Sequence, residues 1–373
     1  MENKKETIKR ISIYKLSIPL KKPFVISLGP IYSADNIIVT IETSSGISGT
    51  GECSPFMTIN GESQQTCFEV GGYLAKGLKG KNVLDIEGNH RIMDDIIYGN
   101  SSIKSAFDIA MYDVASQSAG QPLWQFIGGK KIKKIFTDYT ISLGTPDEMA
   151  AHAQQLKEEG FKIIKVKLGG DAETDIARMK AIRKALGKKI KIRVDANQGW
   201  NVKDAIKVLN GIADLGIQYC EEPIPRWNFM NLKTVRKRSK VKVMADESCC
   251  NAHDAERLIN LKSCDMFNLK LGKSSGIFGA LKIINLAEKA GMEMQIGGFM
   301  ESKIAMTANA HLAMTSSNVH YFDFDTPLMF TEEPVAGGIV YGKSGEISLP
   351  SGNGLGAGVK KEILNTLKKK VVG

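Results

Sequence analysis

Five ionisable side chains recur along this chain at nearly equal intervals, each at or just after the end of a short apolar run. Lys167, Asp195, Glu221, Asp246 and Lys270 are separated by 28, 26, 25 and 24 residues. Short apolar runs are typical of buried strands, and one strand, one helix and two loops need about this length. The spacing therefore predicts a repeated strand–helix unit that carries one ionisable group at each strand end.

The same repeat extends on both sides and predicts an α/β fold with a (β/α)8-type barrel. Units wound in one hand close into a barrel, and the carboxyl ends of their strands meet on one face. The five groups are therefore expected to share one pocket. The candidate strands, with helical segments between them, are IFTDYTIS, FKIIKVKL, KIKIRVDA, IQYCEE, KVMADE, DMFNLKL, MEMQIG and VHYFDFD.

Three carboxylates in one small pocket indicate a bound cation. Without one they could not all be ionised, and hard oxygen ligands favour Mg²⁺ or Mn²⁺. A lysine on each side of the cation favours proton transfer over phosphate binding. Lys165 and Lys167 share one face of their strand, so a second ammonium is expected to lower the pKa of one of them toward neutrality. Taken singly, any of these residues is better explained as a surface charge or a loop cap, and only the five in register favour a shared site.

The rest of the chain predicts an α+β cap around the barrel. Residues 8–55 alternate as strands, interrupted at 19–35 by a segment rich in proline and glycine that predicts a long lid or binding loop. Residues 62–127 follow a helical period. We predict a capping domain over 1–130, the barrel over 131–340, and a tail over 341–373 that returns to the cap.

Composition excludes several other classes of protein. The net charge is +10, but the lysines lie in short scattered clusters without a nucleic-acid motif. We therefore predict that these lysines face solvent and that the protein has no nucleic-acid partner. No apolar run is long enough to cross a membrane, and the charged first ten residues do not resemble a secretory signal, so a cytoplasmic protein is predicted. The six cysteines form no CxxC pair and are predicted to be free buried thiols.

Asp323 and Asp325 share a face at the end of the last predicted strand. With no lysine or arginine beside them in the sequence, they could hold an ammonium group of a substrate. The alternative is that they cap the loop before Pro327. None of the histidines falls at a barrel strand end near the carboxylates, so a histidine base is disfavoured.

In these residues the chain resembles the muconate-lactonizing branch of the enolase superfamily, and most closely its dipeptide epimerases. The resemblance covers nearly the whole chain, and its motifs together are highly specific. They are GTGE at 49–52, KVK at 165–167, DANQGW at 195–200, EEP at 221–223, ADES at 245–248, NLKLGKSSGI at 268–277 and GFMESK at 298–303.

The resemblance implies a role for each candidate residue. One Mg²⁺ per subunit, replaceable by Mn²⁺, would be bound by Asp195, Glu221 and Asp246. Lys167 and Lys270 would be the acid/base catalysts on opposite faces of the substrate α-carbon. The residues that the resemblance implies to assist or to contact substrate are Lys165, Thr140, Gly298, Phe299, Met300, Asp323 and Asp325. Asp323 and Asp325 would bind a free α-amino group.

The implied activity is epimerisation of the C-terminal residue of a dipeptide, with L-Ala-L/D-Glu as the leading candidate and a homo-oligomer allowed. One departure bears on that substrate: Gly29 stands where relatives specific for glutamate carry an arginine, so Lys21, Lys22 or Lys303 would have to replace it. The alternatives are an N-acylamino acid racemase or cycloisomerase of the same superfamily, and a catalytically silent basic scaffold.

Overall fold

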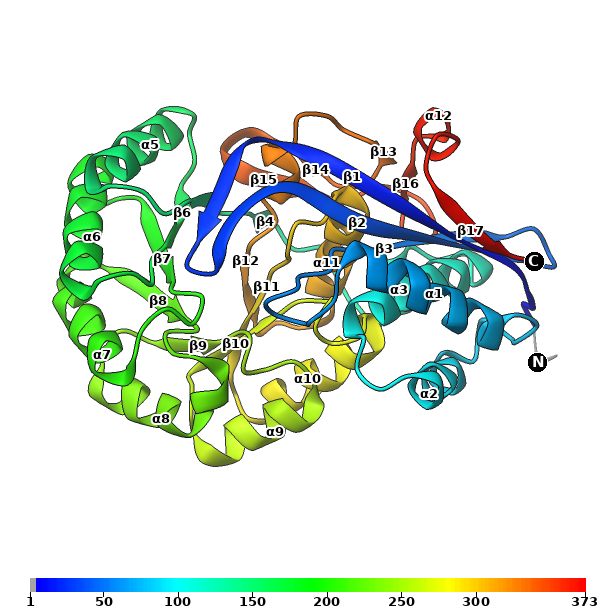
Figure 1. Ribbon diagram of the computed structural model, residues 1–373, viewed down its shortest axis with the longest axis horizontal. Helices are drawn as coiled ribbons and strands as arrows, with labels where there is room; N and C mark the ends of the chain where they lie inside the picture. Colours follow the sequence, from blue (N-terminus) through cyan, green and yellow to red (C-terminus); the bar gives the residue numbers. More distant parts are fainter. Residues whose placement is uncertain (1–4) are drawn as a thin grey trace.

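The computed structural model describes residues 5–373, which form a curled parallel sheet ringed by helices and an antiparallel sheet with helices of its own (Figure 1). In the described chain the parallel sheet has eight strands in sequence order, β5 to β12. They are β5 (Tyr139–Ile141), β6 (Ile163–Lys167), β7 (Lys191–Asp195), β8 (Ile217–Glu221), β9 (Val243–Ala245), β10 (Met266–Leu269), β11 (Glu293–Ile296) and β12 (Val319–Phe322).

Helices connect these strands and cover the outer side of the sheet, which confirms the predicted α/β barrel class (Figure 1). They are α5 (Pro146–Glu158), α6 (Ala172–Leu186), α7 (Val202–Gly211), α8 (Phe229–Arg238), α9 (Ala252–Leu261), α10 (Ile277–Lys289) and α11 (Lys303–Leu312). After β12 the chain forms only the short 3-10 helix η4 (Thr326–Met329). The two end strands meet where the Asp138 N–H donates to the Phe322 carbonyl over 3.3 Å.

The cap is built on a second sheet, in the order β17-β1-β2-β3. Strand β17 comes from the tail of the chain and pairs antiparallel with β1. The cap strands are β1 (Ile8–Ile26), β2 (Gly29–Thr43), β3 (Ser48–Cys53) and β17 (Lys369–Val372). The helices packed on these strands are α1 (Gln64–Leu78) and α3 (Ser101–Ser118), and α2 (Ile86–Ile96) packs against both helices. The single turn α4 (Leu123–Phe126) follows.

Other tail segments lie along the barrel, outside these two sheets. Strand β13 (Val335–Gly337) pairs with β16 (Ala357–Val359), and β14 (Val340–Tyr341) pairs with β15 (Glu346–Ser348), which also pairs with β4 (Ile135–Phe136). The short turns η5 (Lys343–Gly345) and α12 (Lys361–Leu364) connect them. The predicted strand IFTDYTIS is thus divided between β4, in this small sheet, and β5, in the barrel.

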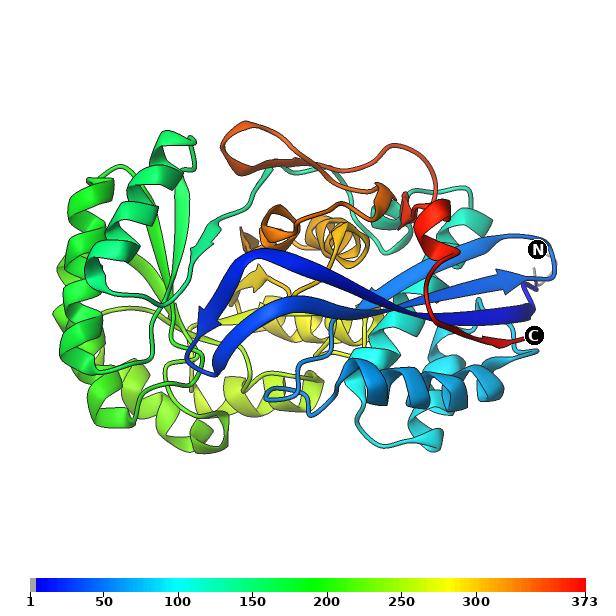
Figure 2. The ribbon, with the colours of Figure 1, turned by 45° about the horizontal axis from the view of Figure 1, so that its top comes forward.

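The long loop predicted over residues 19–35 is wrong, because this segment is a two-stranded hairpin arm. Strands β1 and β2 stay paired out to Ile26 and Gly29, with a register shift between Pro19 and Phe24. A two-stranded arm leaves one edge of each strand free, and prolines there remove no ladder hydrogen bond. Gly29, at φ +119°, follows the two-residue turn. Figure 2 shows the arm crossing over the parallel sheet.

Buried carboxylates join the cap to the barrel at the beginnings of two barrel helices. Glu52 on β3 accepts hydrogen bonds from the N–H groups of Ser302 (2.9 Å) and Ala305 (3.0 Å) at the start of α11. Asp108 on α3 accepts one from the Ile277 N–H, the first residue of α10. A helix N-terminus carries partial positive charge and unpaired N–H groups, so each carboxylate holds one barrel helix against the cap.

All six cysteines are free, and Cys250 alone among them is only partly buried, which confirms the prediction of free thiols. Burial raises the pKa of the Cys249 thiol well above its ordinary value. These thiols are therefore packing groups. Among residues 5–373, no helix is both long and apolar enough to cross a bilayer.

A buried histidine predicts an acid-sensitive contact between α11, α4 and the tail. His311 accepts a hydrogen bond from the Trp124 N–H at Nδ1 (3.1 Å), and its Nε2 lies 3.1 Å from the Leu355 carbonyl. Burial lowers its pKa to about 4. The unfolded chain therefore takes up a proton at higher pH than the folded one, and stability is lost as pH falls from about 6.5 to about 4, by up to about 3 kcal/mol.

Substitution of His311 by glutamine should reduce that acid-side loss by about the same amount. The measurement is the free energy of unfolding in urea at pH 7 and pH 4 for wild type, His311→Gln and a control, His253→Gln, which alters an exposed histidine. Equal pH dependence in wild type and His311→Gln would contradict the assignment.

Candidate functional site

The two lysines of β6 point into the barrel among the predicted carboxylates. The Lys165 Nζ lies 3.1 Å from Asp195 Oδ2, 2.8 Å from Glu221 Oε2 and 2.7 Å from Asp323 Oδ2, and the side chain is fully buried. The Lys167 Nζ lies 2.6 Å from the same Asp195 oxygen. Alternation along the strand places both lysines on one face.

The three predicted metal ligands come from consecutive parts of the sheet. Asp195 and Glu221 are paired in register at the ends of β7 and β8, and Asp246 follows β9 directly. All three are fully buried. Glu221 accepts hydrogen bonds from Asn268 Nδ2 (2.8 Å) and Gln295 Nε2 (3.1 Å). The structure thus brings the predicted trio together.

On the opposite side of the site, two further lysines contact Asp246. The Lys270 Nζ, just after β10, lies 2.8 Å from Asp246 Oδ2 and over the Phe299 ring. The Lys273 Nζ lies 2.5 Å from Asp246 Oδ1. Strands β6 and β10 are four positions apart in the eight-stranded sheet, so Lys167 and Lys270 reach the site from opposite walls.

The carboxylates dominate the electrostatics of the site. Burial acts to lower the pKa of Lys165, but Asp323, Glu221 and Asp195 outweigh it and raise that pKa well above its ordinary value. The expected lowering by a second ammonium is therefore wrong for Lys165. Burial, together with Asp195, raises the pKa of Glu221 to about 8. For Asp195, the ammonium groups of Lys167 and Lys165 overcome burial and hold the pKa well below its usual range.

Unpaired buried oxygens show that the residues around the trio fit a hard cation. Asn197 Oδ1, Asn268 Oδ1 and Glu247 Oε2 have no hydrogen-bond partner although they are buried. All three neighbour the predicted ligands in sequence or contact them. An unpaired buried polar atom is costly, and carboxylate and amide oxygens are the donors that Mg²⁺ and Mn²⁺ prefer. The donor set therefore suits such an ion.

A second carboxylate group lies beside the first, at the end of β12. One oxygen from each of Asp138, Asp323 and Asp325 lies within 4.8 Å of the others. Asp325 Oδ2 accepts a hydrogen bond from the Thr140 N–H over 2.6 Å, and Asp138 Oδ2 lies 2.7 Å from Arg193 Nη1. The predicted pair, Asp323 and Asp325, is therefore part of a trio.

The remaining predicted contact residues line one small cavity between the hairpin arm and the strand ends. Thr140, Gly298, Phe299 and Met300 all border it, as do Lys167, Lys270, Asp323 and Asp325. The hairpin is held over it by the Ser27 hydroxyl, which donates to the Asn197 carbonyl over 2.8 Å. The rest of the lining is Phe24, Ile26, Ile31, Phe56, Ile59, Asn197 and Thr326.

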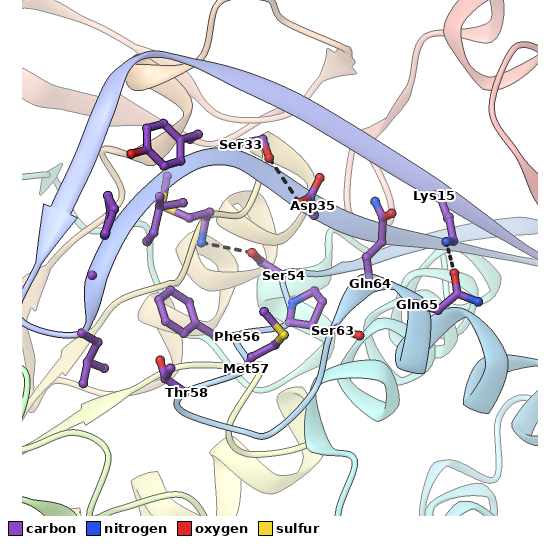
Figure 3. A pocket seen from close by; sticks show the side chains of 17 residues that line it. Lys15, Ser33, Asp35, Ser54, Phe56, Met57, Thr58, Ser63, Gln64 and Gln65 are labelled. Carbon is purple, nitrogen blue, oxygen red and sulfur yellow. Dashed lines mark hydrogen bonds between the residues drawn. The ribbon is translucent and has the colours of Figure 1, made fainter.

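A larger cavity of about 610 Å³ adjoins the first one, between the hairpin arm and the segment after β3. Figure 3 shows Phe56, Met57 and Thr58 on one side of it and Ser33 and Asp35 on the other. It shares Ile31, Phe56 and Met300 with the small cavity. Its position makes it a continuation of the small cavity toward the cap.

Several charged residues of the site were missed in the sequence. Asp138 and Arg193 lie inside predicted strands, where Arg193 shares the inward face of Asp195, so strand alternation could have indicated it. Lys273 lies three residues past Lys270, outside the predicted strand, so strand spacing did not indicate it. Glu247 follows Asp246 directly, and no pattern distinguished it from a loop residue.

Comparison with known protein families identifies the family and the fold. The model described as "Mandelate racemase / muconate lactonizing enzyme, N-terminal domain" matches residues 9–128, and "Enolase C-terminal domain-like" matches residues 148–363. The chain belongs to the mandelate racemase and muconate lactonizing enzyme family of the enolase superfamily, which confirms the resemblance seen in its motifs.

Individual relatives match the chain over nearly its whole length. It is 55% identical to a D-Ala-D/L-Ala epimerase of Cytophaga hutchinsonii, covering 97% of this chain and 98% of the relative. It is 39% identical to an L-Ala-D/L-Glu epimerase of Bacillus subtilis, covering 93% and 95%. The crystal structure of a dipeptide epimerase from Cytophaga hutchinsonii, complexed with Mg and D-Ala-L-Val, is 54% identical, with a TM-score of 0.98 over 98% of this chain and all of that one.

Proposed function

We propose that this protein is a dipeptide epimerase, an isomerase that inverts the α-carbon of the C-terminal residue by 1,1-proton transfer. The observation that carries the proposal is the placement of Lys167 and Lys270 on opposite walls of one cavity, with three buried carboxylates between them. The named relatives and the dipeptide complexes among similar structures support it.

In the proposed reaction the two lysines act on opposite faces of the α-carbon. One lysine, as the free amine, takes the α-proton. The other, as the ammonium ion, gives its proton to the opposite face, so that configuration is inverted and the proton count of the site is unchanged. Lys165 assists by balancing the charge of Asp195 and Glu221, which it contacts.

Asp195, Glu221 and Asp246 would bind one Mg²⁺ per subunit. When bound, the ion offsets the negative charge that develops on the substrate carboxylate, and Mn²⁺, with the same preference for oxygen donors, can replace it. Without the ion the three carboxylates would repel the carboxylate end of the substrate, so substrate binding would depend on the ion that they hold. The test is a dipeptide library in D₂O: deuterium should enter the C-terminal α-position of some members, and no incorporation in any member would overturn the proposal.

Asp323 and Asp325 are proposed to bind the free α-amino group of the dipeptide, with Thr140 and the Gly298–Met300 segment positioning its backbone. Both carboxylates border the cavity and are otherwise buried. A buried carboxylate pair facing a cavity is complementary to an ammonium group. This separates a dipeptide epimerase from an N-acylamino acid racemase, whose substrate has no ammonium group.

Asp323→Asn should lower kcat/KM for free-amine dipeptides about 100-fold, since truncating one partner of a buried charge pair costs about 2 to 5 kcal/mol. Activity toward N-acylated substrates, if any, should change little. Steady-state kinetics on both substrate types makes the comparison, with Glu332→Gln, an exposed carboxylate, as control. Efficient turnover of N-acylated substrates, with no selective loss on free-amine dipeptides in the variant, would favour the racemase alternative.

The side-chain preference is proposed to be small or apolar rather than glutamate. The cavity walls away from the catalytic groups are apolar: Phe24, Ile26, Ile31, Phe56, Ile59 and Met300. Lys21 donates to the Leu328 carbonyl (2.9 Å), and Lys303 pairs with Glu333 (2.8 Å). Lys22 is exposed and does not border the cavity, so none of the three lysines replaces the arginine that relatives specific for glutamate carry at the position of Gly29. Ala-Ala and Ala-Val should therefore surpass Ala-Glu in kcat/KM by at least about tenfold. A glutamate preference would restore the L-Ala-L/D-Glu prediction.

The division into a capping part (1–130 and 341–373) and a barrel (131–340), the cytoplasmic location and a homo-oligomeric assembly are further proposals. The pairing of β17 with β1 supports the first. Free cysteines support the second, because disulfides are rare in the cytosol.

A further inference from the structure

Asp138 is a buried carboxylate near the proposed ammonium site that the proposed reaction does not use. It lies between β4 and β5, at the seam where the first and last barrel strands meet. Its Oδ2 is paired with Arg193 at 2.7 Å, but its Oδ1 is buried without a hydrogen-bond partner. It does not border the cavity. Any influence of Asp138 on a substrate therefore passes through Asp323 and Asp325.

The nearby cations do not neutralise the three carboxylates of Asp138, Asp323 and Asp325. Arg193 contacts Asp138, and Lys165 contacts Asp323, but Lys165 is shared with Asp195 and Glu221. Three carboxylates thus face one full cation and part of another. Carboxylates within 4.8 Å of one another in a buried site cannot all be ionised without further positive charge.

Two sources of positive charge can complete the trio: a bound proton, or the ammonium group of a substrate. Burial and Asp323 raise the pKa of Asp325 to about 7, and burial and Asp323 raise that of Asp138 well above its ordinary value. A second divalent ion fits less well, because Lys165 and Arg193 already contact two of the three carboxylates. A single positive charge brings the trio closer to neutrality.

We propose that Asp138 is a positioning residue for substrate binding: with Asp323 and Asp325 it forms a three-carboxylate unit that holds a proton when the amine site is empty and releases it to solvent when the α-ammonium of a dipeptide enters. The inference rests on the proposed function. The exchange of a proton for an ammonium keeps the charge of the buried site constant, so binding requires no net burial of charge.

The groups that face the trio are few and fixed. Arg193 comes from β7, Lys165 from β6 and the Thr140 N–H from β5. Tyr341 from β14 donates a hydrogen bond from its hydroxyl group to the carbonyl of Phe324 over 2.5 Å. Phe324 lies between Asp323 and Asp325 in the sequence. Other titratable groups near the trio are Tyr139, whose pKa burial raises to about 12, and Tyr219, whose pKa burial raises well above its ordinary value.

The test is calorimetric binding of a dipeptide in the presence of Mg²⁺ at pH 7, in two buffers of different ionisation enthalpy. An equilibrated mixture of both epimers of the substrate is used, so that no net reaction contributes heat. Wild type should release close to one proton per dipeptide bound. Asp138→Asn should release less than half as much, raise KM about tenfold and leave kcat within about threefold, since one lost charge interaction is worth about a factor of ten.

A purely structural role makes a different prediction. Tyr341→Phe removes a hydrogen bond from the same segment without changing charge, so it should lower stability and leave the proton count at the wild-type value. Asp138→Glu should restore part of the proton release. If Asp138→Asn fails to fold, the test rests on the number of protons that wild type releases per dipeptide bound. No proton release between pH 6 and 8 would overturn the inference.

The outcomes also separate this inference from the proposed function. If no dipeptide is bound or epimerised, the proposed function fails. If wild type epimerises dipeptides but Asp138→Asn equals it in KM and in protons released, the inference about Asp138 fails alone.

Discussion

Replacing Lys167 with alanine is expected to abolish epimerisation of both isomers of a dipeptide substrate, with a loss of about 1,000-fold or more, because positioned acid/base groups contribute about 10²- to 10⁴-fold each. Inversion needs one lysine on each face of the α-carbon, and Lys167 and Lys270 approach from β6 and β10 on opposite walls. The variant should still exchange the α-proton of one isomer with D₂O through Lys270, without inverting it. Lys270→Ala should exchange the other isomer.

The measurement is optical rotation for inversion and mass spectrometry for deuterium, on each isomer separately. Lys242→Ala serves as the matched control, because Lys242 is exposed and pairs with Glu293 at the far end of the barrel strands. Full turnover in Lys167→Ala would remove that residue from its role. Exchange of both isomers in both lysine variants would show that one base serves both faces.

The barrel and the core of the site could be predicted because they depend on local period and spacing. Buried parallel strands are short apolar runs, and a strand–helix repeat fixes where the strand ends fall. Asp195, Glu221, Asp246 and Lys270 stand at such ends, so closing the sheet was enough to bring them together. The prediction of these four positions did not require knowledge of how distant side chains pack.

The hairpin arm could not be predicted, because its signals are those of a loop. Pro19, Pro23 and Pro30 argue against a strand that is paired on both edges, and only the tertiary structure shows that this arm has a free edge on each strand. The error matters for function, since Phe24, Ile26 and Ile31 of the arm form the apolar wall of the cavity.

Charge balance was the other feature that spacing did not reveal. The positions of Lys165 and Asp323 were predicted from separate strands, but their ion pair of 2.7 Å depends on the curvature of the sheet. The predicted lowering of a lysine pKa fails at Lys165 for the same reason. The sequence showed an ammonium group two residues away but not the three carboxylates that surround Lys165.

Removal of divalent ions with a chelator is expected to eliminate both epimerisation and α-proton exchange, and Mg²⁺ or Mn²⁺ should restore them. Without the ion, the substrate carboxylate would meet Asp195, Glu221 and Asp246, three buried carboxylates, and be repelled. The loss should exceed that of either lysine variant, because both substrate binding and stabilisation of the developing charge are removed together.

Binding of the ion can be followed without activity. Saturating Mg²⁺ at about 100 times its dissociation constant should stabilise the folded protein by about 2.7 kcal/mol, seen as a rise in Tm. Glu221→Gln should lose most of that rise, whereas Glu293→Gln, at the opposite end of the barrel, should keep it. Full exchange in the presence of chelator would contradict the metal site, and a Tm rise without any divalent-dependent exchange across a dipeptide library would favour the silent scaffold.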